Sequence, residues 1–74
     1  MQKIIVLGGG MVGSVIARDL KSSGFDVTVA DMNESIIEKL NYFDIKFQNL
    51  NFASDQKVLD LVKNFDLVIG AVPG

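Results

Sequence analysis

A short apolar run near the start of the chain stops abruptly at three consecutive glycines. Residues 3–7 read KIIVL and residues 8–13 read GGGMVG. A run this rich in β-branched residues is typical of a strand that is buried on both faces. The apolar residues that follow share one stripe of a helix, and they are Val12, Val15, Ile16 and Leu20. The sequence therefore predicts a strand, a glycine turn and a helix that ends near residue 23, where Gly24 can adopt the left-handed capping conformation.

The chain then repeats this alternation of strand and helix. Residues 25–30 (FDVTVA) favour a second strand, which ends at Asp31. Asn33 is a good N-cap for a short second helix. Residues 45–48 predict a third strand, and two polar residues interrupt its apolar run. That interruption favours an outer position in the sheet.

A third helix and a fourth strand complete the pattern. Ser54 or Asp55 can cap the helix, and residues 67–71 favour the strand. The apolar stripe of the third helix consists of Val58, Leu59, Leu61, Val62 and Phe65. Strands that alternate with helices through short connections imply a parallel sheet with right-handed crossovers. We therefore predict the α/β class, with a Rossmann-type parallel sheet of strand order 3-2-1-4 and helices on both faces.

The length of the chain limits how much of such a fold it can form. A complete Rossmann domain continues from its fourth strand into a second mononucleotide-binding half. Residues 1–74 are therefore predicted to be the N-terminal, front half of a doubly wound domain, and incomplete. A chain of this size buries only about 60% of the surface that its unfolded form exposes, so it is marginally stable alone. The fourth strand would be an open apolar edge, which favours a homo-oligomer formed by strand pairing.

Composition and charge argue against several classes of function. Apolar residues make up 49% of the chain and charged residues 22%, which is the balance of a globular domain. The net charge is -2 without a cluster of Lys or Arg, which argues against nucleic acid or an anionic membrane as a partner. The sequence contains no Cys and no His, so it offers no disulfide, thiolate, zinc site or histidine base. It carries no signal or spanning segment, and a cytoplasmic location is expected.

The glycines at the end of the first strand form a pattern that carries chemistry. Gly8, Gly10 and Gly13 read GxGxxG, which is typical of dinucleotide binding between a strand and a helix. Gly8 permits a tight turn, Gly10 leaves space for a pyrophosphate, and Gly13 lets the helix approach the sheet. The amides of Met11 and Val12 lie at the positive end of the helix, where they can bind phosphate oxygens, and their side chains are expected to pack. The middle glycine of the GGG run is not required by the motif, and we interpret it as slack in the loop.

An acid at the end of the second strand gives the motif its context. Asp31 follows the glycines by about twenty residues, where a carboxylate can accept both hydroxyls of an adenosine ribose. In NADP one hydroxyl carries a phosphate that this carboxylate would repel. The residues that follow are Met32, Asn33, Glu34 and Ser35, and none of them is basic. NAD is therefore the predicted cofactor, with Met32 among the binding residues, and a turn or cap residue is the alternative interpretation of Asp31.

Three segments carry a resemblance to a known family. They read KIIVLGGGMVGSVIARDL, VTVADMN and LVKNFDLVIGAVPG. Together they resemble the N-terminal cofactor domain of the saccharopine dehydrogenase-like family, in particular its lysine 6-dehydrogenase branch. The first two segments are shared by many Rossmann families. The third, a fourth strand that ends in GAVPG, is the more specific.

The resemblance implies an NAD-dependent dehydrogenase that acts on a CH-NH or CH-NH2 group of an amino-acid substrate, which a domain outside these residues would bind. It implies that the backbone of Ala71, Val72 and Pro73 passes the nicotinamide side of the cofactor, and a buried strand end followed by a Pro-Gly turn is the alternative interpretation. Asn51 takes the place of an Asp that relatives often carry near the adenine, and its amide could still bond the adenine edge. No catalytic residue can be named, because the groups that act on the substrate lie elsewhere.

A regulatory nucleotide sensor is the alternative from a different class. Cytoplasmic NAD-binding domains that gate potassium uptake systems are similar in the first strand, the glycine loop and the acid after the second strand. They usually carry Gly-Asp after the third strand, where this chain has Leu50, Asn51 and Phe52. A flavin-binding domain fits less well because Glu is its more familiar acid after the second strand. A methyltransferase fits less well still because residues 3–7 contain no acid.

Overall fold

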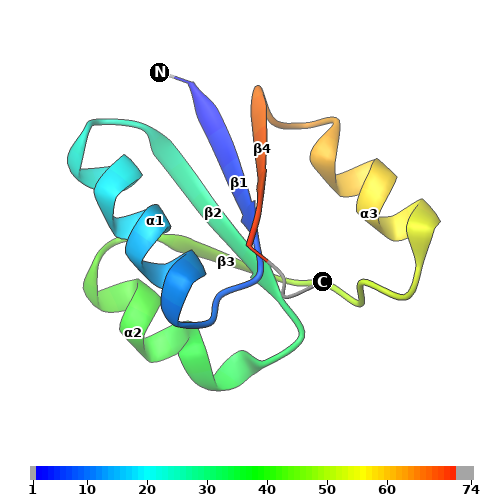
Figure 1. Cartoon of the computed structure of the whole chain (residues 1–74), viewed down its shortest axis with the longest axis horizontal. Helices are drawn as coiled ribbons and strands as arrows, with labels where there is room; N and C mark the ends of the chain where they lie inside the picture. Colours follow the sequence, from blue (N-terminus) through cyan, green and yellow to red (C-terminus); the bar gives the residue numbers. More distant parts are fainter. Residues whose placement is uncertain (1, 72–74) are drawn as a thin grey trace.

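The computed structural model describes residues 2–71, in which strands and helices alternate (Figure 1). The elements are β1 (Lys3–Leu7), α1 (Met11–Ser22), β2 (Asp26–Asp31), the 3₁₀ turn η1 (Glu34–Ile36), α2 (Ile37–Tyr42), β3 (Lys46–Asn49), α3 (Asp55–Val62) and β4 (Leu67–Gly70). The predicted order of elements is confirmed, and most ends differ by one or two residues, but α3 ends at Val62, three residues before the Phe65 of its predicted stripe. No helix within this described range has both the length and the apolar character needed to cross a bilayer.

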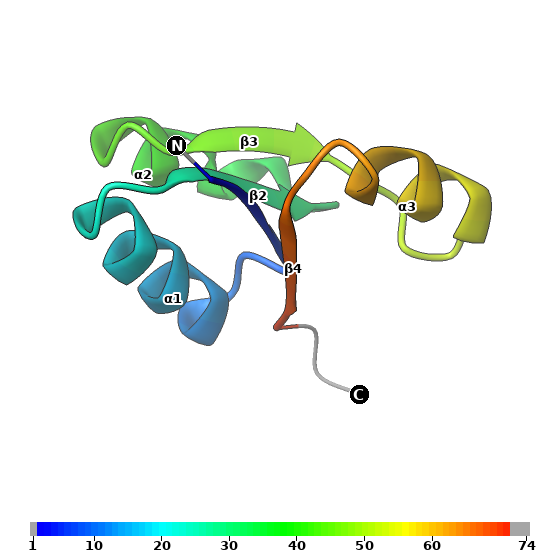
Figure 2. The same cartoon turned by 90° about the horizontal axis from the view of Figure 1, so that it is seen from above.

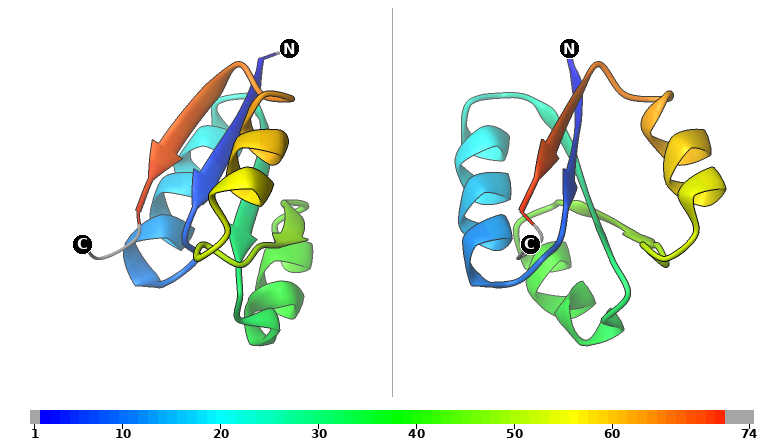
Figure 3. Two further views of the ribbon diagram at one scale, coloured as in Figure 1. Left: turned by 90° about the vertical axis from the view of Figure 1, so that its right-hand side faces the viewer. Right: turned by 45° about the vertical axis from the view of Figure 1, so that its right-hand side comes forward.

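The strands form one parallel sheet in the order β3-β2-β1-β4. β1 is central, and its side chains Ile4, Ile5 and Val6 are at most 1% exposed. Such burial is expected of a parallel strand that is covered on both faces. β4 lies at one edge of the sheet beside β1, as Figure 3 shows, and β3 forms the other edge. The predicted fold class and strand order are therefore confirmed, including the outer position of β3.

Helices cover both faces of the sheet, with α1 and α2 on one side and α3 on the other (Figures 1 and 2). The core under α1 and α2 is built from Val6, Ala17, Val27, Val29, Leu40 and Ile45. The core under α3 is built from Ile5, Ala30 and Leu50, against which Val58, Leu61, Val62 and Phe65 pack. Successive residues of one strand therefore contribute to the cores on opposite sides of the sheet, because their side chains point to opposite faces.

The ends of the first two helices follow the chemistry predicted for them. Gly24 has φ of 95°, and its amide donates to the carbonyl of Lys21 at 3.0 Å. The side chain of Asn33 accepts from the amide of Ser35 at 3.0 Å and so caps the following turn. That turn is 3₁₀ in its first part and becomes α-helical only at Ile37.

Parts of two predicted apolar stripes are exposed. Val12 is 65% exposed and Val15 is 50% exposed, because α1 faces the sheet with its small residues Gly13 and Ala17. The helix lies close to the sheet through these residues, and Ile16 and Leu20 pack against the same core, whereas Val12 and Val15 face outward. Leu59 of α3, also assigned to a buried stripe, is 60% exposed. The helices are positioned as predicted, but each buries a narrower face.

Candidate dinucleotide-binding site

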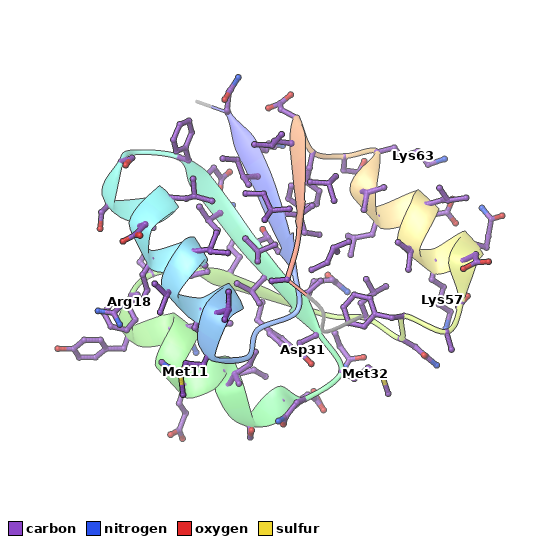
Figure 4. The ribbon with its side chains drawn as sticks, viewed as in Figure 1. Met11, Arg18, Asp31, Met32, Lys57 and Lys63 are labelled. Carbon is purple, nitrogen blue, oxygen red and sulfur yellow. The ribbon has the colours of Figure 1, made fainter. Side chains whose placement is uncertain are left out.

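A cleft of about 390 Å³ opens at the carboxyl ends of the central strands. It is lined by Gly8, Gly10, Met11, Val12, Asp31, Met32, Phe52 and Ala71. These residues come from the loop after β1, the first turn of α1, the end of β2 and the segments that follow β3 and β4. Figure 4 shows Asp31 and Met32 near the ends of the central strands, with Met11 at the start of α1. Ligands of open parallel sheets bind at this edge, where the connections of neighbouring strands diverge.

Two glycines bring the loop and α1 tightly against the sheet. Gly8 has φ of 103°, a conformation that residues with a Cβ rarely adopt, and its amide donates to the carbonyl of Ala30 at 2.8 Å. A Cβ at Gly13 would collide with the carbonyl oxygen of Gly8 and lie 2.9 Å from its carbonyl carbon. Gly13 is buried beneath the loop and does not line the cleft. Its position agrees with the predicted close approach of helix and sheet.

Gly10 differs from both of these glycines. A Cβ at Gly10 would have no other atom within 4 Å, and Gly10 lines the cleft. The space beside its Cα is therefore open in the protein and available to a ligand. The first helical bond is donated by Ser14 to the carbonyl of Gly10 at 2.8 Å, so the amides of Met11 and Val12 precede the hydrogen-bond ladder of α1. This arrangement fits a pyrophosphate at the amino end of the helix.

The side chains of Met11 and Val12 do not pack as predicted. They are 85% and 65% exposed, and both border the cleft. They lie on the side of the first turn of α1 that borders the cleft, whereas Gly13 and Ser14 of the same turn are buried. Both positions can therefore contact a ligand through side-chain as well as main-chain atoms.

Gly9 is not slack in the loop, and that interpretation was wrong. A Cβ at Gly9 would overlap Ile36 Cδ1 and lie 2.9 Å from Val29 Cγ1. Its amide donates to Asp31 Oδ2 at 2.6 Å. Gly9 is therefore glycine because the loop rests directly on β2 and on the turn that follows β2.

Asp31 holds its carboxylate at the wall of the cleft. Oδ2 accepts from the amide of Gly9 at 2.6 Å, and Oδ1 accepts from the amide of Asn33 at 3.0 Å. The bond to Asn33 closes a local turn, as the alternative interpretation of Asp31 required. The bond to Gly9 links the end of β2 to the glycine loop. Asp31 thus stabilises a turn and also faces the space beside the glycine loop.

The segment after β3 contributes a different residue from the one predicted. Phe52 lines the cleft, whereas Asn51 does not line it. The Oδ1 atom of Asn51 accepts from the amide of Ala53 at 2.9 Å and so closes a turn. The sequence did carry a signal for Phe52, since a lone aromatic residue follows a strand at the ligand-binding edge. The contact of Asn51 with adenine stays a prediction.

The segment after β4 reaches the cleft at its first residue. Ala71 lines the cleft, and its amide donates to the carbonyl of Leu7 at 2.8 Å. The backbone after β4 therefore lies beside the end of β1, close to the glycine loop. The predicted contacts of Val72 and Pro73 lie outside the described residues.

The sheet order and the glycine cleft together define a Rossmann-type domain. The chain belongs to the family described as "Alanine dehydrogenase/PNT, C-terminal domain", whose model matches residues 1–74. This match agrees with the expected cofactor domain, and the resemblance to the saccharopine dehydrogenase-like family and its lysine 6-dehydrogenase branch stays a prediction.

Individual relatives come from two classes of protein. The chain is 35% identical over 65 residues to the Trk system potassium uptake protein TrkA homolog of Pyrococcus abyssi, covering 85% of this chain and 29% of the relative. It is 34% identical over 71 residues to alanine dehydrogenase of Staphylococcus epidermidis, covering 95% of this chain and 19% of the relative. The chain thus spans less than a third of the length of either relative.

A solved structure has the same fold. The A chain of dipicolinate synthase from Bacillus subtilis superposes with a TM-score of 0.79 at 22% sequence identity. The superposition covers 99% of this chain and 23% of that chain. At this identity the likeness shows the fold alone, and it agrees with the parallel sheet described above.

Proposed function

We propose that the chain binds NAD in the cleft and forms the cofactor-binding part of an oxidoreductase that acts on an amino-acid amine carbon. The observation that carries the proposal is the open space beside Gly10, faced by the carboxylate of Asp31 in the same cleft. When bound, the nicotinamide would exchange a hydride with the substrate carbon. The match to the alanine dehydrogenase family supports the choice of an amine substrate over other hydride donors.

Each part of the cleft suits one part of the cofactor. The amides at the start of α1 would donate to the pyrophosphate, and the absence of a side chain at Gly10 would let it approach the backbone. The carboxylate of Asp31 would accept the ribose hydroxyls. Met32 and Phe52 line the cleft with apolar surface that suits an adenine ring. The chain itself would therefore bind and orient the cofactor, and a substrate domain elsewhere would handle the substrate and its proton.

Calorimetric titration of the purified protein with NAD, NADP and ADP tests the binding part of this proposal. We expect NAD and ADP to bind and NADP to bind about tenfold more weakly or worse, because like charges near Asp31 repel. Absence of NAD and ADP binding would overturn the proposal.

A regulatory NAD sensor is the second candidate function. The similarity to a potassium uptake protein homolog over 85% of the chain favours it specifically. A sensor would use the same cleft but would transfer no hydride. It therefore shares the binding prediction above and differs in the fate of the bound nucleotide.

An assay of NADH formation separates the two candidates. The full-length protein is incubated with NAD and a panel of amino acids, and absorbance of the reduced nicotinamide is followed. Turnover with an amino acid supports the dehydrogenase. Tight NAD binding without turnover on any amino acid, together with a ligand-dependent change in assembly, would support the sensor instead.

A further inference from the structure

A chain of two hydrogen bonds connects a buried side chain of α1 to the carboxylate of Asp31. The hydroxyl of Ser14 donates to the carbonyl oxygen of Gly9 at 2.9 Å. The amide of Gly9 donates in turn to Asp31 Oδ2 at 2.6 Å. The two peptide groups that flank the Cα of Gly9 are thereby held from opposite sides. The helix, the glycine loop and the end of β2 are linked at one residue.

The side chains around these two hydrogen bonds leave the glycine loop little freedom to move. Ser14 is 3% exposed, so its hydroxyl is shielded from competing water. Val29 is fully buried, and its Cγ1 would lie 2.9 Å from a Cβ at Gly9. Because Val29 is β-branched and packed in the core, it cannot turn aside easily. Any side chain at Gly9 would therefore lift the loop from β2 and lengthen the bond to Asp31.

The carboxylate of Asp31 retains acceptor capacity after these bonds are made. A carboxylate offers about four lone-pair sites. One is used by the amide of Gly9 and one by the amide of Asn33. The remaining sites are available to a ligand, and the two amides fix their direction. A carboxylate fixed before the ligand arrives loses less side-chain entropy on binding.

We propose that Ser14 and Gly9 are positioning residues that fix the ribose-binding carboxylate of Asp31 and so determine how strongly the site recognises the 2′-hydroxyl of adenosine. The inference rests on the proposed nucleotide-binding function. It adds that recognition at the end of β2 depends on a side chain inside α1 that does not line the cleft.

The test compares the affinity for ADP with the affinity for 2′-deoxy-ADP, which lacks the hydroxyl that Asp31 would accept. Calorimetry is done on the unaltered protein and on the Ser14→Ala and Gly9→Ala variants. We expect the unaltered protein to prefer ADP by about tenfold, the value of one hydrogen bond to a charged group. Both variants are expected to lose most of this preference, because the carboxylate is no longer held in place.

A matched control is available on the same helix. The hydroxyl of Ser23 donates to the carbonyl of Asp19 at 3.1 Å, which is the same kind of bond on an exposed surface. The Ser23→Ala variant should keep the full preference for ADP. If Ser14 had a purely structural role, Ser14→Ala would lower the melting temperature or weaken the binding of ADP and 2′-deoxy-ADP equally. The ratio of the two affinities would then stay the same.

The outcomes separate this inference from the proposed function. Binding of ADP by all variants with an unchanged preference over 2′-deoxy-ADP would overturn the inference and leave the proposed function intact. Failure of the unaltered protein to bind ADP would overturn both. Should Ser14→Ala not fold, Gly9→Ala decides alone, because the φ of Gly9 is not in the left-handed region and the atom nearest to the new methyl group is the end of the Ile36 side chain, which can move.

Discussion

At Gly10 a side chain would extend into the cleft without touching another part of the protein. A Cβ there has no other atom within 4 Å. The Gly10→Val variant should therefore fold with nearly unchanged stability and fail to bind NAD, because the branched side chain occupies the space of the pyrophosphate. Circular dichroism and calorimetric titration check the two halves of this prediction. An unchanged NAD affinity in the folded variant would mean that the loop is only a turn.

Asp31 carries the prediction about cofactor choice. In the double variant Asp31→Ser with Met32→Arg, NAD should bind more weakly and NADP more tightly. The change removes a charge that repels the 2′-phosphate by about 1 to 4 kcal/mol at 4 Å and adds a bidentate partner for it. The ratio of the two dissociation constants, measured by titration, is the readout.

The control for this prediction removes a carboxylate from the opposite end of the sheet. Asp66 accepts from the amide of Lys3 at 2.8 Å, far from the cleft. The Asp66→Ser variant removes one negative charge, as the Asp31→Ser half of the double variant does, and it should leave the ratio of NAD to NADP affinity unaltered. Equal affinity of the unaltered protein for both cofactors would show that Asp31 does not bind the ribose.

Single residues were predictable from sequence only where a motif fixes their role. The roles of Gly8 and Gly13 depend on backbone contacts that every GxGxxG loop makes, and the structure has both contacts. The role of Gly9 depends on Val29 and Ile36, which lie more than a strand away in sequence. No pattern within the loop could reveal those neighbours. Ser14 has its partner only five residues away, but a main-chain carbonyl leaves no residue-specific signal in the sequence.

The contact between α1 and the glycine loop can be tested at the level of the element. In the Gly13→Ala variant the new methyl group would collide with the carbonyl of Gly8 and push α1 away from β1. We expect a loss of about 1–3 kcal/mol in the free energy of unfolding, typical of overpacking in a core. Urea denaturation measures this loss, and Gly10→Ala is the matched control that should cost much less. Equal midpoints of urea denaturation for Gly13→Ala and Gly10→Ala would contradict the tight contact between Gly13 and Gly8.

The elements themselves were predicted well because their signals are local. A β-branched run, a helical stripe and a capping Asn each depend on neighbours within a few residues. The buried face of α1 was predicted less well. The apolar stripe pointed to Val12 and Val15, but the helix approaches the sheet through Gly13 and Ala17. Small residues allow a helix to come closest to the sheet. An apolar stripe read from the sequence favours large side chains and therefore misses such a contact.

At the scale of the molecule, the two edges of the sheet differ in chemistry. In the edge strand β4, Leu67 is 48% exposed and Val68 is 42% exposed. The other edge strand, β3, exposes mainly polar residues. Unprotected apolar edge strands pair readily with other chains. We therefore predict that the 74-residue chain in isolation dimerises or aggregates through β4. Sedimentation velocity over a range of concentrations measures this association.

Substitutions at the two edges make the prediction specific. The Val68→Lys variant should reduce association, because a charge on an edge strand opposes pairing. The matched variant Gln48→Lys adds the same charge to β3 and should leave association unaltered. A soluble monomer of the unaltered chain at high concentration, or equal effects of the two lysines, would exclude pairing through β4.

The strand order also governs how the chain can assemble as it is synthesised. β1 emerges first, but its partner β4 emerges last, and the amide of Lys3 meets the carboxylate of Asp66 across 63 residues. The nascent β1 can pair with β2 early, while its other edge stays unpaired until residues 67–70 leave the ribosome. Contacts so distant in sequence slow folding. Of the two central strands, β1 is therefore the one that waits longer for its second neighbour during translation.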